Sequence, residues 1–256
     1  MTISTEIREL NDNSFWGHDV IVEDDVQIGK YTILHPGTRI CKGSRIGSHC
    51  EIGVPSDLAD SKGLTISPHS LIRSHSVFYE GSRFGDHLTT GHRVTVRENT
   101  IAGSNFQIGT LSDIQGHCEI GDHVRFHSNV HIGQGAKIGN FVFIFPYVVL
   151  TNDPTPPSNN LSGVTVEDFA VIATMSTVLP GVKIGKDALV GAQSLVREDV
   201  PAGMICVGVP GKNVGSTSKI KLKSNGESAY PWRRHFHRGY PERVVNEWKE
   251  EFACPD

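Results

Sequence analysis

The residues best suited to chemistry in this sequence are its histidines. The chain has 13 of them, and eight lie between His69 and His131. A neutral imidazole exchanges protons near pH 7, because its unperturbed pKa is about 6.5. His117 and His127 are the strongest candidates for a base, and Asn129 offers an amide that could orient a carbonyl or a substrate. The pattern indicates general acid–base chemistry supported by a fixed polar group.

A six-residue repeat determines where these side chains can lie. Stepping by six through 66–150 gives 15 positions, of which only Thr90 is not apolar. At the overall apolar frequency of 38%, about six apolar residues would be expected by chance. The same rhythm runs through 22–52 and 166–196, so the chain has 27 such anchor positions.

Short strands on a period of six predict a parallel β-helix. A single hexad cannot bury its apolar side alone, so successive hexads must stack about 4.8 Å apart. Three hexads make one triangular coil, which predicts an all-β fold of about nine coils in residues 21–212. The three blocks are out of phase, so we expect two loop excursions, near residues 54–65 and 151–165. Spacing alone leaves the hand of the coil open.

The two ends of the chain fall outside this repeat. Residues 1–20 form a lead-in, and residues 213–256 form a carboxyl-terminal extension. A helix is predicted near 241–252, because Pro241 suits a first helical turn and Trp248 and Phe252 recur on one face. The helix either caps the coils and joins subunits or completes a substrate pocket.

Stacked coils place residues 18 apart at the same edge. One edge then carries His92, His127 and Asn129, and a second carries Glu98, His117 and Asp153. The two edges could meet across a subunit boundary, so both sets remain candidates for one site.

Composition and charge narrow the function classes. The formal charge is only −4, which argues against a general nucleic-acid binder. No run of 18 apolar residues and no signal-like start are present, so we expect a cytoplasmic protein without a membrane partner. The five cysteines form no CxxC pair, and no metal site is expected from them.

Hexads of the form [LIV]-G-x-x-[small]-x resemble those of the left-handed β-helix acyltransferases over about residues 20–212. The stretches 172–203 and 207–212 are similar to the acetyl-CoA binding end of sugar acetyltransferases, although Gln193 stands where glycine is usual. The segment 141–158, which contains Thr-Asn-Asp and a proline-rich loop, is similar to nucleotide-sugar N-acetyltransferases.

This resemblance implies a function. It implies transfer of an acetyl group from acetyl-CoA, as co-substrate, to the amino group of a UDP- or dTDP-linked sugar in surface polysaccharide synthesis. It also implies a homotrimer with sites between subunits.

The resemblance also assigns roles to individual residues. His117 ends a segment that resembles the Leu-Ala-Gly-His of sugar-nucleotide acyltransferases, and Asn129 falls on an asparagine placed beside the acceptor amine. The residues expected to contact the substrate are His92, Glu98 and Asp153. The residues expected to bind the cofactor are Ala173 and Ala192, along the pantetheine arm, and Arg197 and Lys212, at the phosphates.

Several alternatives stay open. Asp153 could stabilise a turn before Pro154 rather than bind substrate. The protein could be an O-acetyltransferase or a longer-chain acyltransferase, or the amine could lose its proton to water without an enzymatic base. The γ-class carbonic anhydrases share the coil and bind zinc with histidines, for which His87, His92, His123 and His127 are available.

Overall fold

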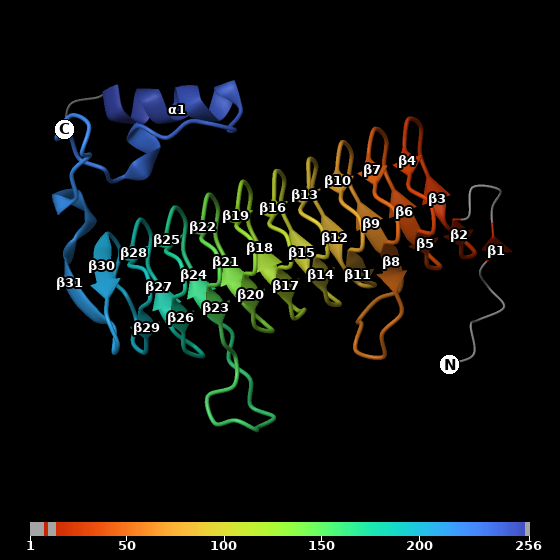
Figure 1. The fold of residues 1–256 in the computed structure, drawn as a ribbon, viewed down its shortest axis with the longest axis horizontal. Coiled ribbons are helices and arrows are strands. Elements are labelled where there is room, and N and C mark those ends of the chain that lie inside the picture. The colour runs from red at the N-terminus through yellow and green to blue at the C-terminus, as the bar shows by residue number, and fades with distance from the viewer. Residues whose placement is uncertain (1–7, 10–13, 254–256) are drawn as a thin grey trace.

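Three flat parallel sheets wind into a long triangular prism (Figure 1). The computed structural model describes residues 8–9 and 14–253. Within each coil the chain passes from sheet B to sheet C, then to sheet A, and back to sheet B. We call the turns between them the B–C, C–A and A–B corners.

The strands are short, and most have two residues. Sheet A contains β1 (Arg8–Glu9), β2 (Phe15–Trp16), β5 (Ile33–Leu34), β8 (Glu51–Val54), β11 (Val77–Tyr79), β14 (Thr95–Val96), β17 (Asp113–Ile114), β20 (His131–Ile132), β23 (Val149–Leu150), β26 (Thr177–Val178) and β29 (Leu195–Val196). Sheet B contains β3 (Ile21–Val22), β6 (Thr38–Ile40), β9 (Leu64–Ile66), β12 (Arg83–Phe84), β15 (Ile101–Ala102), β18 (Glu119–Ile120), β21 (Lys137–Ile138), β24 (Thr165–Val166) and β27 (Lys183–Ile184). Sheet C contains β4 (Gln27–Ile28), β7 (Arg45–Ile46), β10 (Leu71–Ile72), β13 (Thr89–Thr90), β16 (Gln107–Ile108), β19 (Arg125–Phe126), β22 (Phe143–Ile144), β25 (Val171–Ile172), β28 (Leu189–Val190), β30 (Met204–Val207) and β31 (Lys212–Ser216).

The predicted parallel β-helix is confirmed, with a slightly different coil number. Sheets A and C have 11 strands each and sheet B has nine, where the sequence predicts about nine coils. The difference arises at the ends. There β1 pairs antiparallel with β2 and β31 pairs antiparallel with β30. The strand β2 still continues the six-residue period, because Trp16 pairs in parallel with Leu34, 18 residues on, whereas β1, β30 and β31 do not follow it.

The anchor residues form one continuous core along the prism axis. Their side chains point inward and are buried, apart from Val22 and Ile28 in the first coil, which are half-buried. β-branched residues suit this pleated surface. Thr90, the one polar anchor in its block, is also fully buried. Its hydroxyl accepts a hydrogen bond from the Arg73 N–H at 3.0 Å and donates to the Gly91 carbonyl at 2.8 Å. A polar anchor is tolerated because both of its hydrogen bonds are made.

The third residue after most anchors turns the corner with a positive φ. His75, Asn99 and His117 have φ values of 61°, 56° and 49°. Aromatic rings at such positions stack on the coil below, as His49 does on His75 at a centroid distance of 5.0 Å. The crowding of histidines in the sequence therefore has a partly structural cause.

Two loops leave the prism at the same corner (Figure 1). The first joins β8 to β9 and the second joins β23 to β24, so both lie at the A–B corner. They occupy residues 55–63 and 151–164, inside the predicted excursions.

The extension folds back over the B–C corner and sheet C. It contains the short helices η1 (Thr217–Lys219) and η2 (Trp232–Arg234) and the helix α1 (Glu242–Ala253). A second aromatic cluster joins it to the prism, with Trp232 and Trp248 packed against Phe141 and Phe169.

Arg233 fastens this extension electrostatically. Its guanidinium donates to Asp187 at 2.6 Å and to Glu251 at 2.7 Å. Because Asp187 belongs to the B–C corner and Glu251 to α1, one side chain connects the prism to the helix.

No helix in residues 8–9 and 14–253 is long and apolar enough to cross a membrane.

Candidate functional site

The predicted site residues divide between two corners of the chain. His92, His127 and Asn129 lie at the C–A corner, and Glu98 and His117 lie at the A–B corner. Sheet A separates the two sets, so a single chain does not assemble them into one site.

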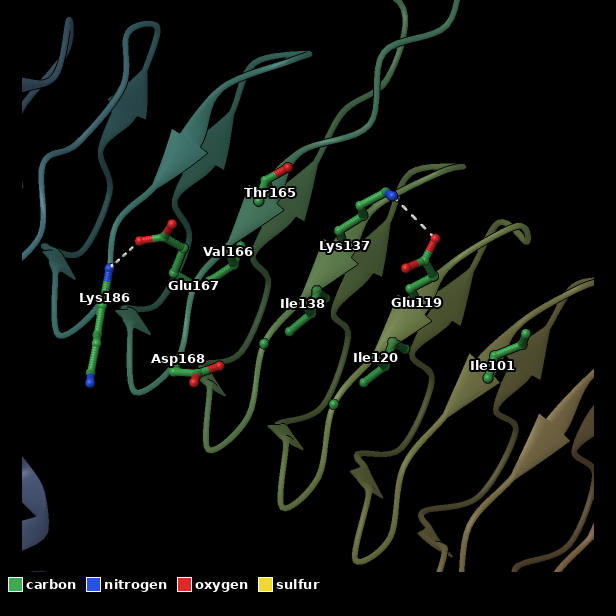
Figure 2. Close-up of a pocket in the computed structure, with 12 residues that line it drawn as sticks. Ile101, Glu119, Ile120, Lys137, Ile138, Thr165, Val166, Glu167, Asp168 and Lys186 are labelled. Atoms are coloured by element: carbon green, nitrogen blue, oxygen red, sulfur yellow. Dashed lines mark hydrogen bonds and ion pairs between the residues drawn. The ribbon is translucent and has the colours of Figure 1, made fainter.

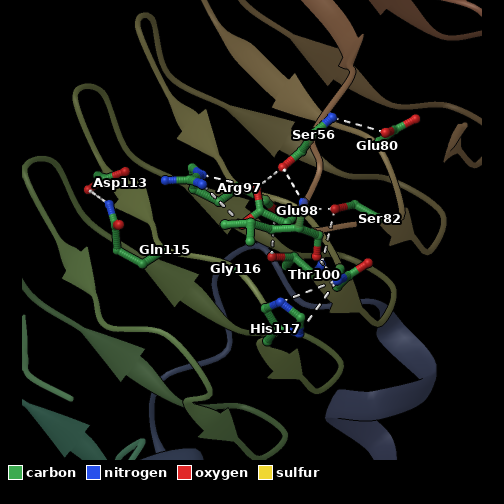
Figure 3. Close-up of polar contacts among 12 residues, drawn as sticks. Ser56, Glu80, Ser82, Arg97, Glu98, Thr100, Asp113, Gln115, Gly116 and His117 are labelled. Carbon is green, nitrogen blue, oxygen red and sulfur yellow. Dashed lines mark hydrogen bonds and ion pairs between the residues drawn. The ribbon is translucent and has the colours of Figure 1, made fainter. Parts of the chain in front are cut away.

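At the A–B corner, two buried carboxylates hold the first loop (Figure 3). Glu80 and Glu98 are only 3% and 2% exposed. The Ser56 N–H donates to Glu80 at 2.9 Å, and the Ser56 hydroxyl donates to Glu98 at 3.2 Å. Lys62 adds an ion pair to Glu80 at 3.0 Å. The two carboxylates thus accept hydrogen bonds from a loop that would otherwise have little to pack against.

Arg97 neutralises Glu98 through a bidentate contact. Its Nε and Nη2 lie 3.0 and 3.1 Å from the two carboxylate oxygens. Burial alone would raise the pKa of Glu98, but Arg97 and the Ser56 hydroxyl together lower it. Glu98 is therefore a charged residue already occupied by partners of its own chain. Glu98 could contact a substrate directly only if the loop moved away. With the loop in place, Glu98 could affect a substrate only by positioning Arg97.

His117 lies half-buried beside this cluster. The amide nitrogen of Asn99, one coil below, is 3.3 Å from Nε2 and 3.5 Å from Nδ1. The other groups of Asn99 hold the loop, because Asp60 donates to its carbonyl at 3.0 Å and its amide donates to the Leu58 carbonyl at 3.1 Å. His117 is thus in contact with the residue that anchors the tip of the loop.

A histidine–aspartate pair on the adjoining part of sheet A was not predicted as a site. His131 Nδ1 is 3.1 Å from Asp113, and Gln115 donates to the same carboxylate oxygen at 2.5 Å. Burial would raise the pKa of Asp113, but the hydrogen bonds from His131 and Gln115 lower it. An Nδ1–H that donates to a carboxylate leaves Nε2 with its lone pair, the arrangement of a general base. The sequence does contain a signal for this pair: Asp113 and His131 are 18 residues apart, which places them side by side on adjacent strands of a β-helix.

His127 is oriented in the opposite sense. Its Nδ1 accepts a hydrogen bond from the Ser128 N–H at 2.9 Å, so the neutral ring carries its proton on Nε2. In this geometry His127 can donate a hydrogen bond but is a poor proton acceptor. His92 contacts the Ser74 hydroxyl through Nδ1 at 2.9 Å. The Asn129 N–H donates to the Thr110 carbonyl of the preceding coil at 2.9 Å.

Asp153 lies in the second loop and binds that loop itself. Its carboxylate accepts hydrogen bonds from the Ser158 hydroxyl and N–H, both at 2.7 Å, and from the Thr155 N–H at 3.0 Å. The Ser158 hydroxyl is the main cause of its lowered pKa, against a smaller opposing effect of burial. The geometry matches the turn-stabilising alternative.

Two of the predicted cofactor residues come together. Arg197 and Lys212 line one cavity of about 330 Å³ near the carboxyl-terminal coils, although Arg197 follows β29 and Lys212 begins β31. Ala173 and Ala192 lie at the C–A corner in consecutive coils. The Ala173 N–H is already bound to the Val190 carbonyl at 2.9 Å, which leaves its carbonyl for a ligand.

A hollow of about 790 Å³ on sheet B has a different character (Figure 2). Its sides carry ion pairs such as Lys137 with Glu119 at 3.2 Å, and its lining includes no histidine. It offers charges already paired across coils and no candidate base.

The four histidines available for zinc are divided between corners. His87 and His123 lie at the B–C corner, whereas His92 and His127 lie at the C–A corner. Among the residues that the structure describes, no group of three or more His, Cys, Asp or Glu side chains could hold a metal ion.

The six-residue repeat matches a known family. A model described as bacterial transferase hexapeptide (six repeats) matches residues 19–53. Over these residues the chain carries the hexapeptide repeat, and its fold is a parallel β-helix. The predicted relationship to the left-handed β-helix acyltransferases is confirmed at the level of this repeat and this fold.

Curated relatives of this hexapeptide-repeat protein include two transferase types. The bifunctional protein GlmU of Mycolicibacterium smegmatis is 29% identical over 210 residues, which cover 81% of this chain and 42% of GlmU. The 2,3,4,5-tetrahydropyridine-2,6-dicarboxylate N-acetyltransferase of Staphylococcus aureus is 34% identical over 93 residues, covering 36% of this chain and 33% of the relative. The chain therefore spans less than half the length of these relatives.

Among solved structures, LpxA of Bacteroides fragilis, a UDP-N-acetylglucosamine acyltransferase, is 14% identical with a TM-score of 0.44. That alignment covers 96% of this hexapeptide-repeat protein and 86% of LpxA.

Proposed function

We propose that this protein transfers the acetyl group of acetyl-CoA to the amino group of a UDP- or dTDP-linked amino sugar. The hexapeptide repeat and the curated relatives, one of them named as an N-acetyltransferase, support acyl transfer. The active form is a homotrimer in which the A–B corner of one subunit meets the C–A corner of the next.

One observation carries the proposal: His117 lies at the A–B corner between the two loops that interrupt the repeat. Loops that leave a rigid solenoid at one corner form the walls of a site there. The coils between them also present Arg97, Gln115 and the Asp113–His131 pair. This corner combines two flanking loops with proton-accepting groups.

The reaction then proceeds by attack of the neutral amine on the thioester carbonyl. The nitrogen lone pair forms the new C–N bond and the C–S bond breaks. His117 accepts the amine proton, and the coenzyme A sulfur leaves and takes a proton. Asn129 from the neighbouring subunit orients the acceptor, and Arg197 and Lys212 bind the phosphates of acetyl-CoA through charge-assisted hydrogen bonds.

The Asp113–His131 pair is a second candidate base. Its geometry leaves Nε2 available, which the structure does not fix for His117. A hydroxyl acceptor needs a stronger base than an amine, so dependence on this pair would favour O-acetyl transfer.

Thiol release from acetyl-CoA tests the proposal against a panel of UDP- and dTDP-linked 3-amino and 4-amino sugars. The variants are His117→Asn, His131→Asn and Asn129→Asp, with His75→Asn as matched control. Asparagine suits the positive φ of His117 and of His75, so both corners keep their backbone. We expect one sugar to be acetylated and His117→Asn to lower kcat about 100-fold or more, with the control unchanged.

Two results would overturn different parts of the proposal. If no sugar releases thiol and acetyl-CoA does not bind, the transferase function is wrong. If a sugar is acetylated but His117→Asn retains full activity, the function stands and the assigned base is wrong.

A further inference from the structure

A cavity of about 360 Å³ lies between sheet C and the carboxyl-terminal extension. Its walls come from two parts of the chain that are far apart in sequence. The coils contribute His127, Phe143, Phe145 and Val171, and the extension contributes Tyr230, Trp232, His235, Phe236 and Arg238.

Most of this wall is aromatic. Phe143 and Phe145 lie side by side with ring centroids 4.8 Å apart, and Phe236 packs edge-on to Phe143 at 6.3 Å. Trp232 and Phe236 form a second edge-on pair at 6.1 Å. Such a wall favours a flat aromatic ring, which can stack on one ring face and meet the edge of another.

Two guanidinium groups adjoin these rings. Arg238 lines the cavity, and Arg125 donates from Nη2 to the Arg238 carbonyl at 3.1 Å. The Arg125 guanidinium is 5.8 Å from the Phe236 centroid and 5.9 Å from the Phe143 centroid. Both cations are therefore beside the same aromatic wall.

Neither cation has an acidic partner. Among the ion pairs of residues 8–9 and 14–253, none involves Arg125 or Arg238, and the cavity lining includes no carboxylate. Burial lowers the pKa of Arg125; Tyr240, whose ring centroid is 3.9 Å from the guanidinium, opposes this effect, and the charge of Arg238 adds to it. Arg233 in the same extension, by contrast, is bound to two carboxylates. Two neighbouring cations without a carboxylate partner can bind an anion.

We propose that this cavity binds a nucleoside diphosphate, with the base among the aromatic rings and the phosphates on Arg125 and Arg238. His127 fits this role, because its Nε2–H is the free donor and can bind a base carbonyl or a phosphate oxygen. The Arg238 side chain is exposed, so phosphates can reach it from solvent.

Two ligands of the proposed acetyltransferase contain a nucleoside diphosphate. The choice between these two ligands rests on the proposed function. One is the UDP or dTDP part of the acceptor sugar, and the other is the adenosine diphosphate part of acetyl-CoA. Because His127 adjoins the C–A corner, a sugar attached to a bound nucleotide would extend toward Asn129.

Calorimetric titration of the full chain with UDP, dTDP, ADP and coenzyme A tests the proposal, with inorganic pyrophosphate as the probe without a base. The variants are Arg238→Gln and Phe145→Leu, and the matched control is Arg243→Gln, an exposed arginine of α1 outside the cavity. Quenching of Trp232 fluorescence gives a second readout from inside the cavity. Far-ultraviolet circular dichroism checks that each variant is folded.

We expect at least one nucleotide to bind and to quench fluorescence. Arg238→Gln should weaken that binding about tenfold or more, and Phe145→Leu should weaken it while the control is unchanged. Tighter binding of UDP or dTDP assigns the cavity to the acceptor, and tighter binding of coenzyme A assigns it to the donor.

The two proposals, the nucleotide cavity and the acetyltransferase function, can fail independently. The cavity assignment is wrong if no nucleotide binds, if Arg238→Gln binds as the wild type does, or if pyrophosphate binds as tightly as the nucleotides. If a nucleotide binds and the variants weaken its binding, but no sugar causes thiol release, the nucleotide cavity is confirmed and the proposed acetyltransferase function is wrong.

Discussion

At the scale of single residues, the tautomer of each histidine decides what it can do. His131 donates from Nδ1 to a carboxylate and keeps a lone pair on Nε2, whereas His127 accepts at Nδ1 and keeps a proton on Nε2. Their roles in proton transfer therefore differ, although both are histidines of the same repeat.

Thr90 provides a residue-scale test of the repeat. In Thr90→Val the inward position becomes apolar like the other anchors, but the Arg73 N–H loses its acceptor. We expect the free energy of unfolding to fall by about 1–3 kcal/mol, because a buried donor is left without a partner. Urea denaturation followed by circular dichroism measures the change.

Thr95→Val, on the outer side of sheet A, is the control and should change stability by roughly 0.5 kcal/mol or less. A Thr90→Val protein at least as stable as the wild type would show that the hydroxyl does not stabilise the corner.

At the scale of elements, the sequence predicted the parallel strands and the two loops, but not how the loops contact the corner residues. Period-six anchors specify which side chains point inward, and a phase slip between blocks marks where a loop must leave. The β30–β31 hairpin was missed because it is antiparallel and has no period. The Asp113–His131 pair was missed because its two side chains lie on the outer face of sheet A, on neighbouring strands, and not at a corner. Whether Glu98 faces a substrate or a loop depends on how residues 55–63 fold back, which spacing does not encode.

The loop at the A–B corner should respond to acid. The pKa of Glu98 is lowered in the folded state, so its carboxylate stabilises the fold above the usual glutamate range, near pH 4.3. This contribution is lost as the pH falls through that range toward the lowered pKa, because the protonated group no longer pairs with Arg97. We expect the protection factors of residues 55–63, corrected for the intrinsic exchange rate at each pH, to fall in acid before those of the core do.

Glu98→Gln should give fast exchange in this loop already at pH 7. Glu119→Gln, on the outer face of sheet B, is the control. In this variant, exchange in residues 55–63 should depend on pH as it does in the wild type. If residues 55–63 are equally protected from exchange in Glu98→Gln and in the wild type, the charge of Glu98 does not hold this loop.

At the scale of the whole molecule, the prism and the extension are two bodies joined along one side. The aromatic cluster supplies the contact area, and Arg233 connects Asp187 to Glu251 across the junction. The proposed nucleotide cavity exists only while this junction is closed, because its two walls belong to the two bodies.

Removing the Arg233 side chain should open this junction. In Arg233→Ala, Asp187 would remain partly buried without its partner, which costs about 3 kcal/mol in comparable buried pairs. We expect a red-shifted tryptophan emission from Trp232 and Trp248, with the far-ultraviolet spectrum of the prism retained.

Arg234→Ala, which removes an exposed neighbour, should leave the emission unchanged. If Arg233→Ala has the emission of the wild type, the aromatic cluster alone holds the extension.

The antiparallel strands at the ends have a consequence for how copies of this molecule coexist. A stack of parallel strands exposes unpaired backbone groups at its first and last members, and any identical stack could add there and grow into a fibre. Here β31 occupies the last edge of sheet C and β1 the first edge of sheet A, each running against its neighbour. A reversed terminal strand offers no continuation of the parallel register, so these two edges do not template the addition of an identical stack.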